Sequence, residues 1–424
     1  MRIPSSGQRL PRVVWLLIAA RAVNRLGAFS LSFLTVLITT EFGASIAAAG
    51  LVSTSFGLAT IPSRLLGGHL ADRFGRRRTI VLGLAGCTVA QLGLAAAGNL
   101  PTAVCSAVFL GLVFELYEPP SQAIIGEVAG TAQRVRAYSL LNAALAVAGV
   151  GAGLLATGLG RWDLRWLFVA DAITCLACAI VIHLVLPADR ARFRGRASRS
   201  ETVSVSPWRD RTLMMLLASG TVFALVYLQV MIVLPLSLAD RGQSPADAGL
   251  LFTASALVIV CGQPLLRANP LAVMSAPAVL TAGYLLLGVG LAGYAAAHSL
   301  PSFLVATAVW SLGDLLLMGR MYAVVADLAP RGASARYMAA YGTSWGIASV
   351  AAPLAGTQLL EHAGTAVLWS VTAAACFVLA IAQPFALRNI SGRSTRAESH
   401  ADVHPAHGPS SPNTALPDPP SGPR

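Results

Sequence analysis

The chain has 424 residues, of which 55% are hydrophobic and only 11% are charged, and its formal net charge is +12. A soluble globular protein carries roughly a quarter charged residues, so this composition excludes an ordinary soluble domain, which would expose too much apolar surface to water. The basic residues fall in short turns between apolar stretches, which argues against nucleic-acid binding. We therefore expect a polytopic helical membrane protein with the lipid bilayer as its surroundings.

A membrane-spanning helix needs roughly 20 apolar residues. Stretches of this kind lie at 14–40, 46–66, 79–98, 102–126, 137–159 and 166–186, and then at 212–238, 247–266, 273–297, 302–326, 336–359 and 364–387. They predict an all-α membrane protein of twelve transmembrane helices in two pseudo-symmetric six-helix bundles. The predicted domains are an N-terminal bundle, a basic cytoplasmic loop, a C-terminal bundle and a disordered tail rich in Pro, Ser and Gly, over residues 1–186, 187–211, 212–387 and 388–424.

Arginine counts predict the orientation of these helices. If both termini are cytoplasmic, 23 arginines fall in cytoplasmic segments, three in outer loops and four inside spans. Because cytoplasmic loops carry the excess of basic residues, this ratio places both termini inside. We expect a multi-pass protein of the cell (cytoplasmic) membrane, most simply a monomer.

An internal repeat relates the two halves. Glu127 and Arg136 lie 200 positions before Asp327 and Arg336, so both pairs match in chemistry as well as in spacing. Repeated six-helix units are typical of transporters whose site lies between the repeats, near the middle of the membrane.

One charged turn interrupts the apolar pattern after the second span. It reads Gly68-His69-Leu70-Ala71-Asp72-Arg73-Phe74-Gly75-Arg76-Arg77-Arg78. This spacing resembles the signature between helices 2 and 3 of the major facilitator superfamily, and the twelve-helix pattern extends the resemblance over residues 14–387. The stretch from Glu118-Pro119-Pro120 to Leu141, and the glycines 149, 151 and 153, look like drug/proton antiporter-type exporters of that superfamily.

The resemblance implies a conformational latch at the cytoplasmic face. In the family, the signature acid caps the start of helix 11 and a signature arginine pairs with an acid at the end of helix 4. These roles would fall on Asp72, Arg76 and Glu127. From the residues themselves, Gly68 and Gly75 permit a tight turn, and Arg73 and Arg77 can stay at headgroup level. Asp327 and Arg336 are the repeat counterparts of the latch.

Two acids lie near the predicted bilayer midplane. Glu115 is about halfway between Pro101 and Glu127, and Asp314 about halfway between Pro301 and Asp327. Ionised carboxylates there cost several kcal/mol unless they are hydrated or paired. We therefore expect both to face a central cavity and to act as protonation switches.

Other side chains are candidates for the same cavity. Glu118 shares a helix face with Glu115, and Arg25 in the first span could neutralise one of them. Tyr117, Tyr227 and Gln229 could line the pocket. Asp171 lies near Arg161 and Arg165 in sequence, which suggests a local ion pair at the outer face.

No phosphate-binding loop, metal-ligand cluster or nucleophile–base set is present in the sequence, so we expect neither an enzyme nor a bound cofactor or metal. The leading hypothesis is a secondary transporter that works by alternating access and exports a drug or amphipathic metabolite, driven by protons. A uniporter or importer of a sugar or organic acid remains open, because the first span has no acid in its body. A receptor or scaffold with a transporter-like fold is the alternative of a different class.

Overall fold

The computed structural model describes residues 11–386, except for residues 29, 119, 122–123, 125–129, 187–206, 265–273 and 330–333. The described residues form helices and no strands, and they belong to one compact unit, residues 1–386. The predicted tail 388–424 and most of the predicted basic loop lie outside the described residues, so the division into four domains stays a prediction.

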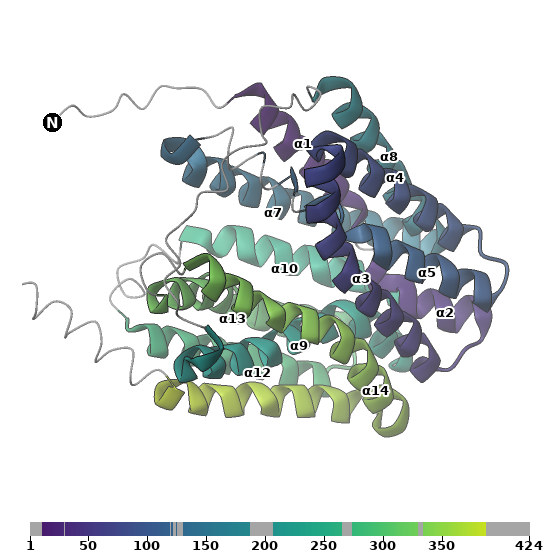
Figure 1. Cartoon of the computed structure of the whole chain (residues 1–424). Coiled ribbons are helices and arrows are strands. Elements are labelled where there is room, and N and C mark those ends of the chain that lie inside the picture. The colour runs from purple at the N-terminus through teal and green to yellow at the C-terminus, as the bar shows by residue number, and fades with distance from the viewer. Residues whose placement is uncertain are drawn as a thin grey trace, which may run out of the picture. The chain divides into compact units, whose positions relative to one another are not determined.

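The first half contains α1 (Arg12–Gly27), the short 3₁₀ helix η1 (Ser30–Phe33), α2 (Leu34–Phe42), α3 (Ile46–Phe74), α4 (Arg76–Ala95), α5 (Leu100–Phe114), α7 (Gly130–Trp162) and α8 (Arg165–Val185). The second half contains η3 (Pro207–Arg209), α9 (Arg211–Asp240), η4 (Pro245–Asp247), α10 (Ala248–Gly262), α12 (Ala276–Ala296), α13 (Leu300–Leu328) and α14 (Ser334–Ala386). In Figure 1 the first half runs from purple to blue and the second from teal to yellow.

The all-α membrane fold is confirmed. Among the described residues, ten helices are long and apolar enough to cross a membrane, and α5 is a shorter apolar helix of 15 residues. The apolar part of α14 has 46 residues, which at ~1.5 Å per residue is more than twice the ~30 Å hydrocarbon thickness. Non-helical backbone at Gly364 (φ 79°) divides α14 where two spans are predicted. The described helices thus match all twelve predicted stretches, and twelve separate crossings stay a prediction.

Three details of the described helices were not predicted from the sequence. The signature is not a long turn, because α3 continues through it to Phe74 and the chain turns only at Gly75, whose φ of 91° suits glycine. The span 14–40 is interrupted after Gly27, where α1 gives way to η1 and α2. The span 102–126 is interrupted after Phe114, shortly before Pro119 and Pro120, residues that remove backbone donors and disfavour helix before them.

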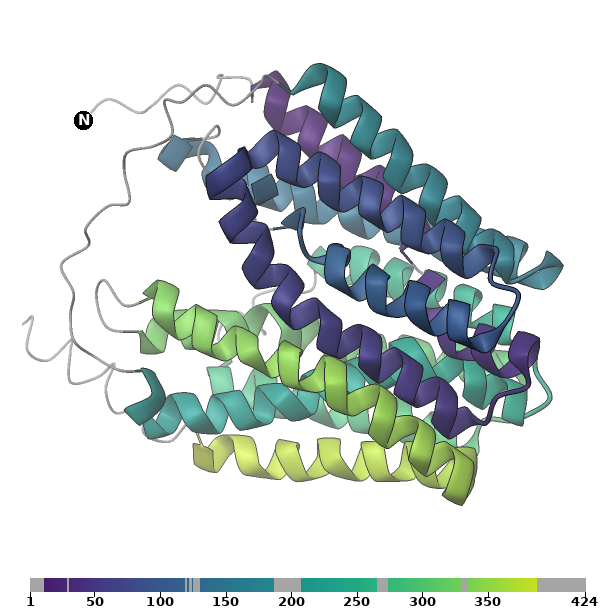
Figure 2. The ribbon, with the colours of Figure 1, turned by 45° about the vertical axis from the view of Figure 1, so that its right-hand side comes forward.

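Among the described residues, two helix pairs form the most extensive contacts between the halves. α3 packs against α14, and α7 packs against α10; Figure 2 shows α3 (dark blue) running alongside the green part of α14. A Cβ atom added at Gly57 of α3 would lie 2.4 Å from the carbonyl oxygen of Ser349, and one added at Gly153 of α7 would lie 2.5 Å from the carbonyl oxygen of Gly249. Glycine is therefore required where these backbones meet.

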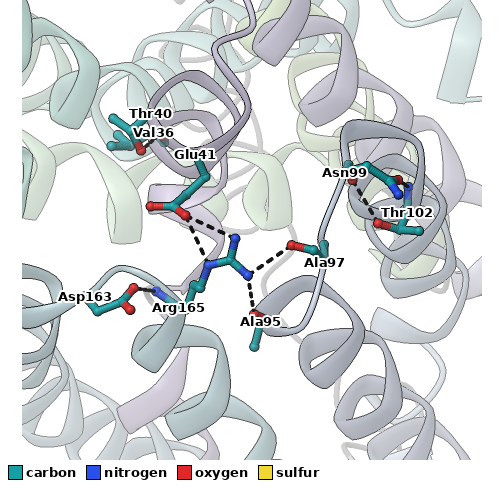
Figure 3. Close-up of polar contacts among 9 residues, drawn as sticks. All are labelled: Val36, Thr40, Glu41, Ala95, Ala97, Asn99, Thr102, Asp163 and Arg165. Carbon is teal, nitrogen blue, oxygen red and sulfur yellow. Dashed lines mark hydrogen bonds and ion pairs between the residues drawn. The ribbon is translucent and has the colours of Figure 1, made fainter.

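Arginines hold the loops at the predicted outer end of both halves. Arg165 binds Glu41 Oε2 through Nε (3.2 Å) and Nη2 (3.1 Å), and its Nη1 donates to the carbonyls of Ala95 and Ala97 at 2.9 and 3.0 Å (Figure 3). Ala95 is the last residue of α4 and Ala97 follows its C-cap, so their carbonyls have no helical partners. The negative end of the helix dipole also favours a cation there.

In the second half, an arginine at a different position of the repeat binds the corresponding carbonyls. Arg241 donates to the carbonyls of Ala295 and Ala297, at 2.7 and 2.5 Å, where α12 ends. These two carbonyls lie 200 positions after Ala95 and Ala97. The repeat seen in the sequence therefore extends to the unpaired backbone groups of the loops.

Candidate functional site

A cavity of about 330 Å³ lies among helices of the first half, between α1, α4, α5, α7 and α8. Three carboxyl side chains line it, Glu115, Glu118 and Asp171, together with the arginines Arg21 and Arg25. Charged groups inside a membrane protein face water-filled cavities or one another. This cavity is therefore a place within the predicted membrane region where polar chemistry can occur.

The break after α5 places two of the carboxyl groups. Residues 115–117 form a turn, so Glu115 and Glu118 leave the helix that precedes them. The backbone N–H of Glu115 donates to Ser63 Oγ of α3 at 3.1 Å, which replaces a partner that a helix would supply. Irregular backbone at membrane depth is tolerated where it is buried in protein or lines a cavity, and this turn does so.

Arginines from two neighbouring helices meet these carboxylates. Arg21 Nη1 of α1 lies 2.6 Å from Glu118 Oε2, and Arg64 Nε of α3 lies 3.4 Å from Glu115 Oε2. The sequence analysis named Arg25 as the neutralising residue and did not name Arg21 or Arg64. All three are charges inside apolar spans, which is the signal that could have found them.

Tyr117 lies beside the first of these pairs. Its buried hydroxyl donates to Asn24 Oδ1 at 3.1 Å, and the guanidinium carbon of Arg21 lies 5.3 Å from the centre of its ring. Tyr117 lines the cavity, and whether it contacts a substrate stays a prediction.

The second-half candidates lie apart from this cavity. Asp314 of α13 is 4% exposed and is not among the lining residues. Gln229 of α9 is buried, and Tyr227 packs edge-on against Trp345, with ring centres 5.4 Å apart. Tyr227 interacts with Arg25, a residue that lines the cavity of the first half.

The predicted latch falls largely outside the described residues. Glu127 is one of the residues that the structure does not describe, and the side chain of Asp72 and the surroundings of Gly68 are likewise outside it. Arg73 lies in the last turn of α3, where its guanidinium lies 5.5 Å from the centre of the Phe74 ring. Arg76 and Arg77 begin α4 after the turn at Gly75.

The repeat counterparts of the latch are equally untested. Asp327 is exposed near the end of α13, and Arg336 lies in the first turn of α14 with its side chain outside the described part. The latch therefore stays a prediction.

The expected pairing of Asp171 with Arg161 and Arg165 is wrong. Arg161 Nη2 lies 2.5 Å from Asp247 at the start of the second half's η4–α10 segment, and Arg165 binds Glu41. No described ion pair joins Asp171 to either arginine, and residues six to ten positions apart in the chain need not share a helix face. Its partners are described below.

Comparison with known proteins agrees with this architecture. The model of the Major Facilitator Superfamily matches residues 17–239 and again residues 215–412. An uncharacterised MFS-type transporter, YqjV of Bacillus subtilis, is 25% identical over 78% of this chain and 82% of its own length. The multidrug resistance protein MdtH of Aeromonas hydrophila is 28% identical over 69% of this chain and 74% of its own length.

Solved structures share the fold at low sequence identity. A peptide transporter POT in complex with sulfate superposes with a TM-score of 0.75 at 16% identity, covering 92% of this chain and 96% of that one. The POT family transporter PepTSo gives a TM-score of 0.73 at 15% identity, covering 90% and 99%. The fold, the paired halves and the two matches of the family model together show that this chain belongs to the Major Facilitator Superfamily.

Proposed function

We propose that this protein exports a drug or amphipathic metabolite across the cytoplasmic membrane in exchange for protons. The observation that carries the proposal is the cavity in which Glu115 and Glu118, beside a broken helix, meet Arg64 and Arg21. The similarity to MdtH, which is named a multidrug resistance protein, supports export over import.

Alternating access in this proposal is a rocking of the first half against the second. The closely packed pairs α3–α14 and α7–α10 are where one half moves over the other. Asp72, Arg76 and Glu127 would form the latch at the cytoplasmic face. Both termini would be cytoplasmic and the protein would work as a monomer.

Proton coupling would use Glu115 and Asp314. Protonation of Glu115 removes the charge that Arg64 meets at 3.4 Å, so Arg64 loses its ionic partner in the first half. Asp314 would be the corresponding protonation site of the second half.

Transport in proteoliposomes tests the coupling directly. With a fluorescent amphipathic substrate inside the vesicles, an imposed proton gradient should drive its flux in the wild type. Glu115→Gln and Asp314→Asn should each remove the dependence of flux on the gradient while leaving exchange of labelled for unlabelled substrate.

Asp163→Asn is the matched control, since Asp163 accepts a hydrogen bond from the backbone of Arg165 at 2.8 Å outside the cavity. Unchanged gradient dependence in both test variants would contradict the coupling assignment. Flux that ignores the proton gradient in the wild type would favour a uniporter, and absence of any flux a receptor or scaffold.

A further inference from the structure

Asp171 is a buried acid that the transport scheme above does not use. It lies in the second turn of α8, is 4% exposed, and contributes to the wall of the 330 Å³ cavity. Its Oδ2 accepts hydrogen bonds from Ser30 Oγ at 2.7 Å and from Gln91 Nε2 at 2.6 Å. The three residues come from η1, α4 and α8, so three separate segments converge on one carboxyl group.

Basic side chains elsewhere in and around the cavity are engaged with other groups. Among the residues that the structure describes, Arg21 pairs with Glu118 and Arg64 with Glu115, whereas no described ion pair includes Asp171. Arg25 lies two positions before Gly27 and thus on the opposite side of α1, since an α-helix turns about 100° per residue. Gly27 is the residue that packs on Asp171, and Arg25 interacts with Tyr227.

The end of α1 adds negative potential at the same place. A Cβ atom added at Gly27 would lie 2.6 Å from Asp171 Oδ1, so the last turn of α1 packs directly on the carboxyl group. Carbonyl groups at a helix C-terminus lack helical partners, and the dipole makes that end negative. Interrupted helices whose C-terminal ends border a carboxylate are a common way for membrane proteins to bind cations.

A second acceptor at this place has no partner. Gln91 is 1% exposed, and its Oε1 has no hydrogen-bond partner among the described residues, although its Nε2 binds Asp171 and Ser30. A buried amide oxygen without a partner destabilises the folded protein. Gln91 also lines the cavity, so a ligand in the cavity can supply what this oxygen lacks.

We propose that Asp171, Gln91 and Ser30 bind a monovalent cation at the break between α1 and η1. One carboxylate charge, an unpartnered amide oxygen, a hydroxyl and a negative helix end together fit a single positive charge that accepts oxygen ligands or donates N–H bonds. Two sources share this chemistry: an alkali-metal ion and the ammonium group of a transported amine. The second source rests on the proposed function, and the first does not.

Alkali-metal ions are tested on the purified protein in detergent. Thermal unfolding is followed in choline chloride while NaCl, LiCl or KCl replaces choline at constant ionic strength. An ion that binds the folded protein raises the unfolding temperature saturably. The rise should occur in the wild type and be absent in Asp171→Asn.

The ammonium source is tested with dansylcadaverine, an amphipathic fluorescent amine. Its fluorescence anisotropy should report saturable binding to the wild type. N-acetyl-dansylcadaverine, which keeps the ring but has no charge, should bind at least about tenfold more weakly, and Asp171→Asn should weaken the amine by a similar factor.

Further variants separate a ligand role from a folding role. Gln91→Leu and Ser30→Ala each remove one proposed ligand and should lower the affinity for whichever cation binds. They therefore test the site if Asp171→Asn does not fold. Asp163→Asn, an acid at the same end but outside the cavity, should bind like the wild type. Size-exclusion profiles of ligand-free samples establish folding.

The proposal is overturned if neither the alkali ions nor dansylcadaverine binds, or if binding survives equally in Asp171→Asn, Gln91→Leu and Ser30→Ala. These measurements need no flux across a membrane. Loss of proton-driven transport and loss of cation binding are therefore distinguishable results.

Discussion

Arg21 and Glu118 are each only about a fifth exposed, with side-chain exposures of 18% and 24%, and their charged atoms are 2.6 Å apart. Arg21 also faces the ring of Tyr117 at 5.3 Å. At this burial, removing one partner leaves a charge that has lost both its water and its counter-ion. The pair is thus more sensitive to single substitutions than an exposed ion pair.

A double-mutant cycle measures this coupling. Arg21→Met and Glu118→Gln should each lower the thermal unfolding temperature, because each removes this buried ion pair. The double variant should recover part of the loss, with a coupling energy of about 1–3 kcal/mol for groups in direct contact. Additive losses in the double variant would show that the two charges do not stabilise each other.

The same double-mutant cycle at Arg64 and Glu115 is a control in which we expect a smaller coupling energy. There the two atoms are 3.4 Å apart and the Arg64 side chain is 59% exposed. Exposed pairs contribute roughly 0–1 kcal/mol, so coupling at this pair should be smaller than at Arg21 and Glu118.

Glycines set how closely the helices of the two halves approach. Gly50 and Gly57 lie two turns apart on the face of α3 that meets α14, and Thr54 between them donates to the carbonyl of Val350 at 3.3 Å. The added Cβ of an alanine at Gly57 would lie 2.4 Å from a backbone oxygen, and backbone cannot move aside as a flexible side chain can.

We therefore expect Gly57→Ala to destabilise the protein and Gly346→Ala to do the opposite. Gly346 lies on α14 with nothing within 4 Å of an added Cβ, so the alanine gains up to about 1 kcal/mol of helix propensity without a clash. Thermal unfolding of the two variants makes the comparison. A Gly57→Ala variant as stable as Gly346→Ala would mean that α3 and α14 are not held in this close contact.

The sequence predicted the helices well and their interruptions poorly. Long apolar runs are a composition signal, and each predicted stretch coincides with described helix. The break after Phe114 lies shortly before Pro119 and Pro120, whereas the break after Gly27 has no proline beside it and lies where α1 packs on Asp171 of α8. The signature was predicted to be a turn because it is rich in charged residues. An arginine in the last turn of α3 can extend to the lipid headgroups while the backbone stays helical.

Site contacts were harder to predict for a related reason. Glu115 lines the cavity of the first half, and its role in a cavity shared by both halves stays a prediction. Its partner Arg64 lies 51 positions earlier in the sequence, and Arg21 lies 97 positions before Glu118. Such distant pairs depend on which helix faces are apposed, and one sequence does not determine that. Asp171 was predicted to pair with arginines close to it in sequence, because the helix contacts were not known. Its partners in the structure, Ser30 and Gln91, are 141 and 80 positions away.

The orientation of the whole molecule in the membrane follows from arginine distribution and is open to a direct test. Green fluorescent protein fused after Arg424 should fluoresce, because it matures in the cytoplasm. Alkaline phosphatase inserted at Gly242, a predicted outer loop, should be active, and the same insertion at Gly75 should be inactive. Activity at Gly75 together with inactivity at Gly242 would reverse the predicted topology and place the signature outside.

Contacts between the halves gather toward the predicted outer end and offer a test of rocking. Arg161 pairs with Asp247 across the halves, and Glu361 of α14 accepts a hydrogen bond from the backbone N–H of Ala47 in α3. Arg161 is 54% exposed, so its pair contributes at most about 1 kcal/mol and weakens at high salt. Removing it should shift an equilibrium between closed and open outer ends by up to about fivefold.

Spin labels report that shift. With the exposed Cys105 and Cys261 replaced, labels at Ala96 and His298, in equivalent outer loops of the two halves, should show a short-distance population in the wild type. Asp247→Asn should transfer part of that population to a longer distance at low salt, and less so at high salt. Asp163→Asn, whose contact stays within the first half, should leave the distribution unchanged. Identical distributions in all three proteins would mean that this ion pair does not hold the outer end closed, and the close packing of α3 on α14 and of α7 on α10 would then be sufficient to do so.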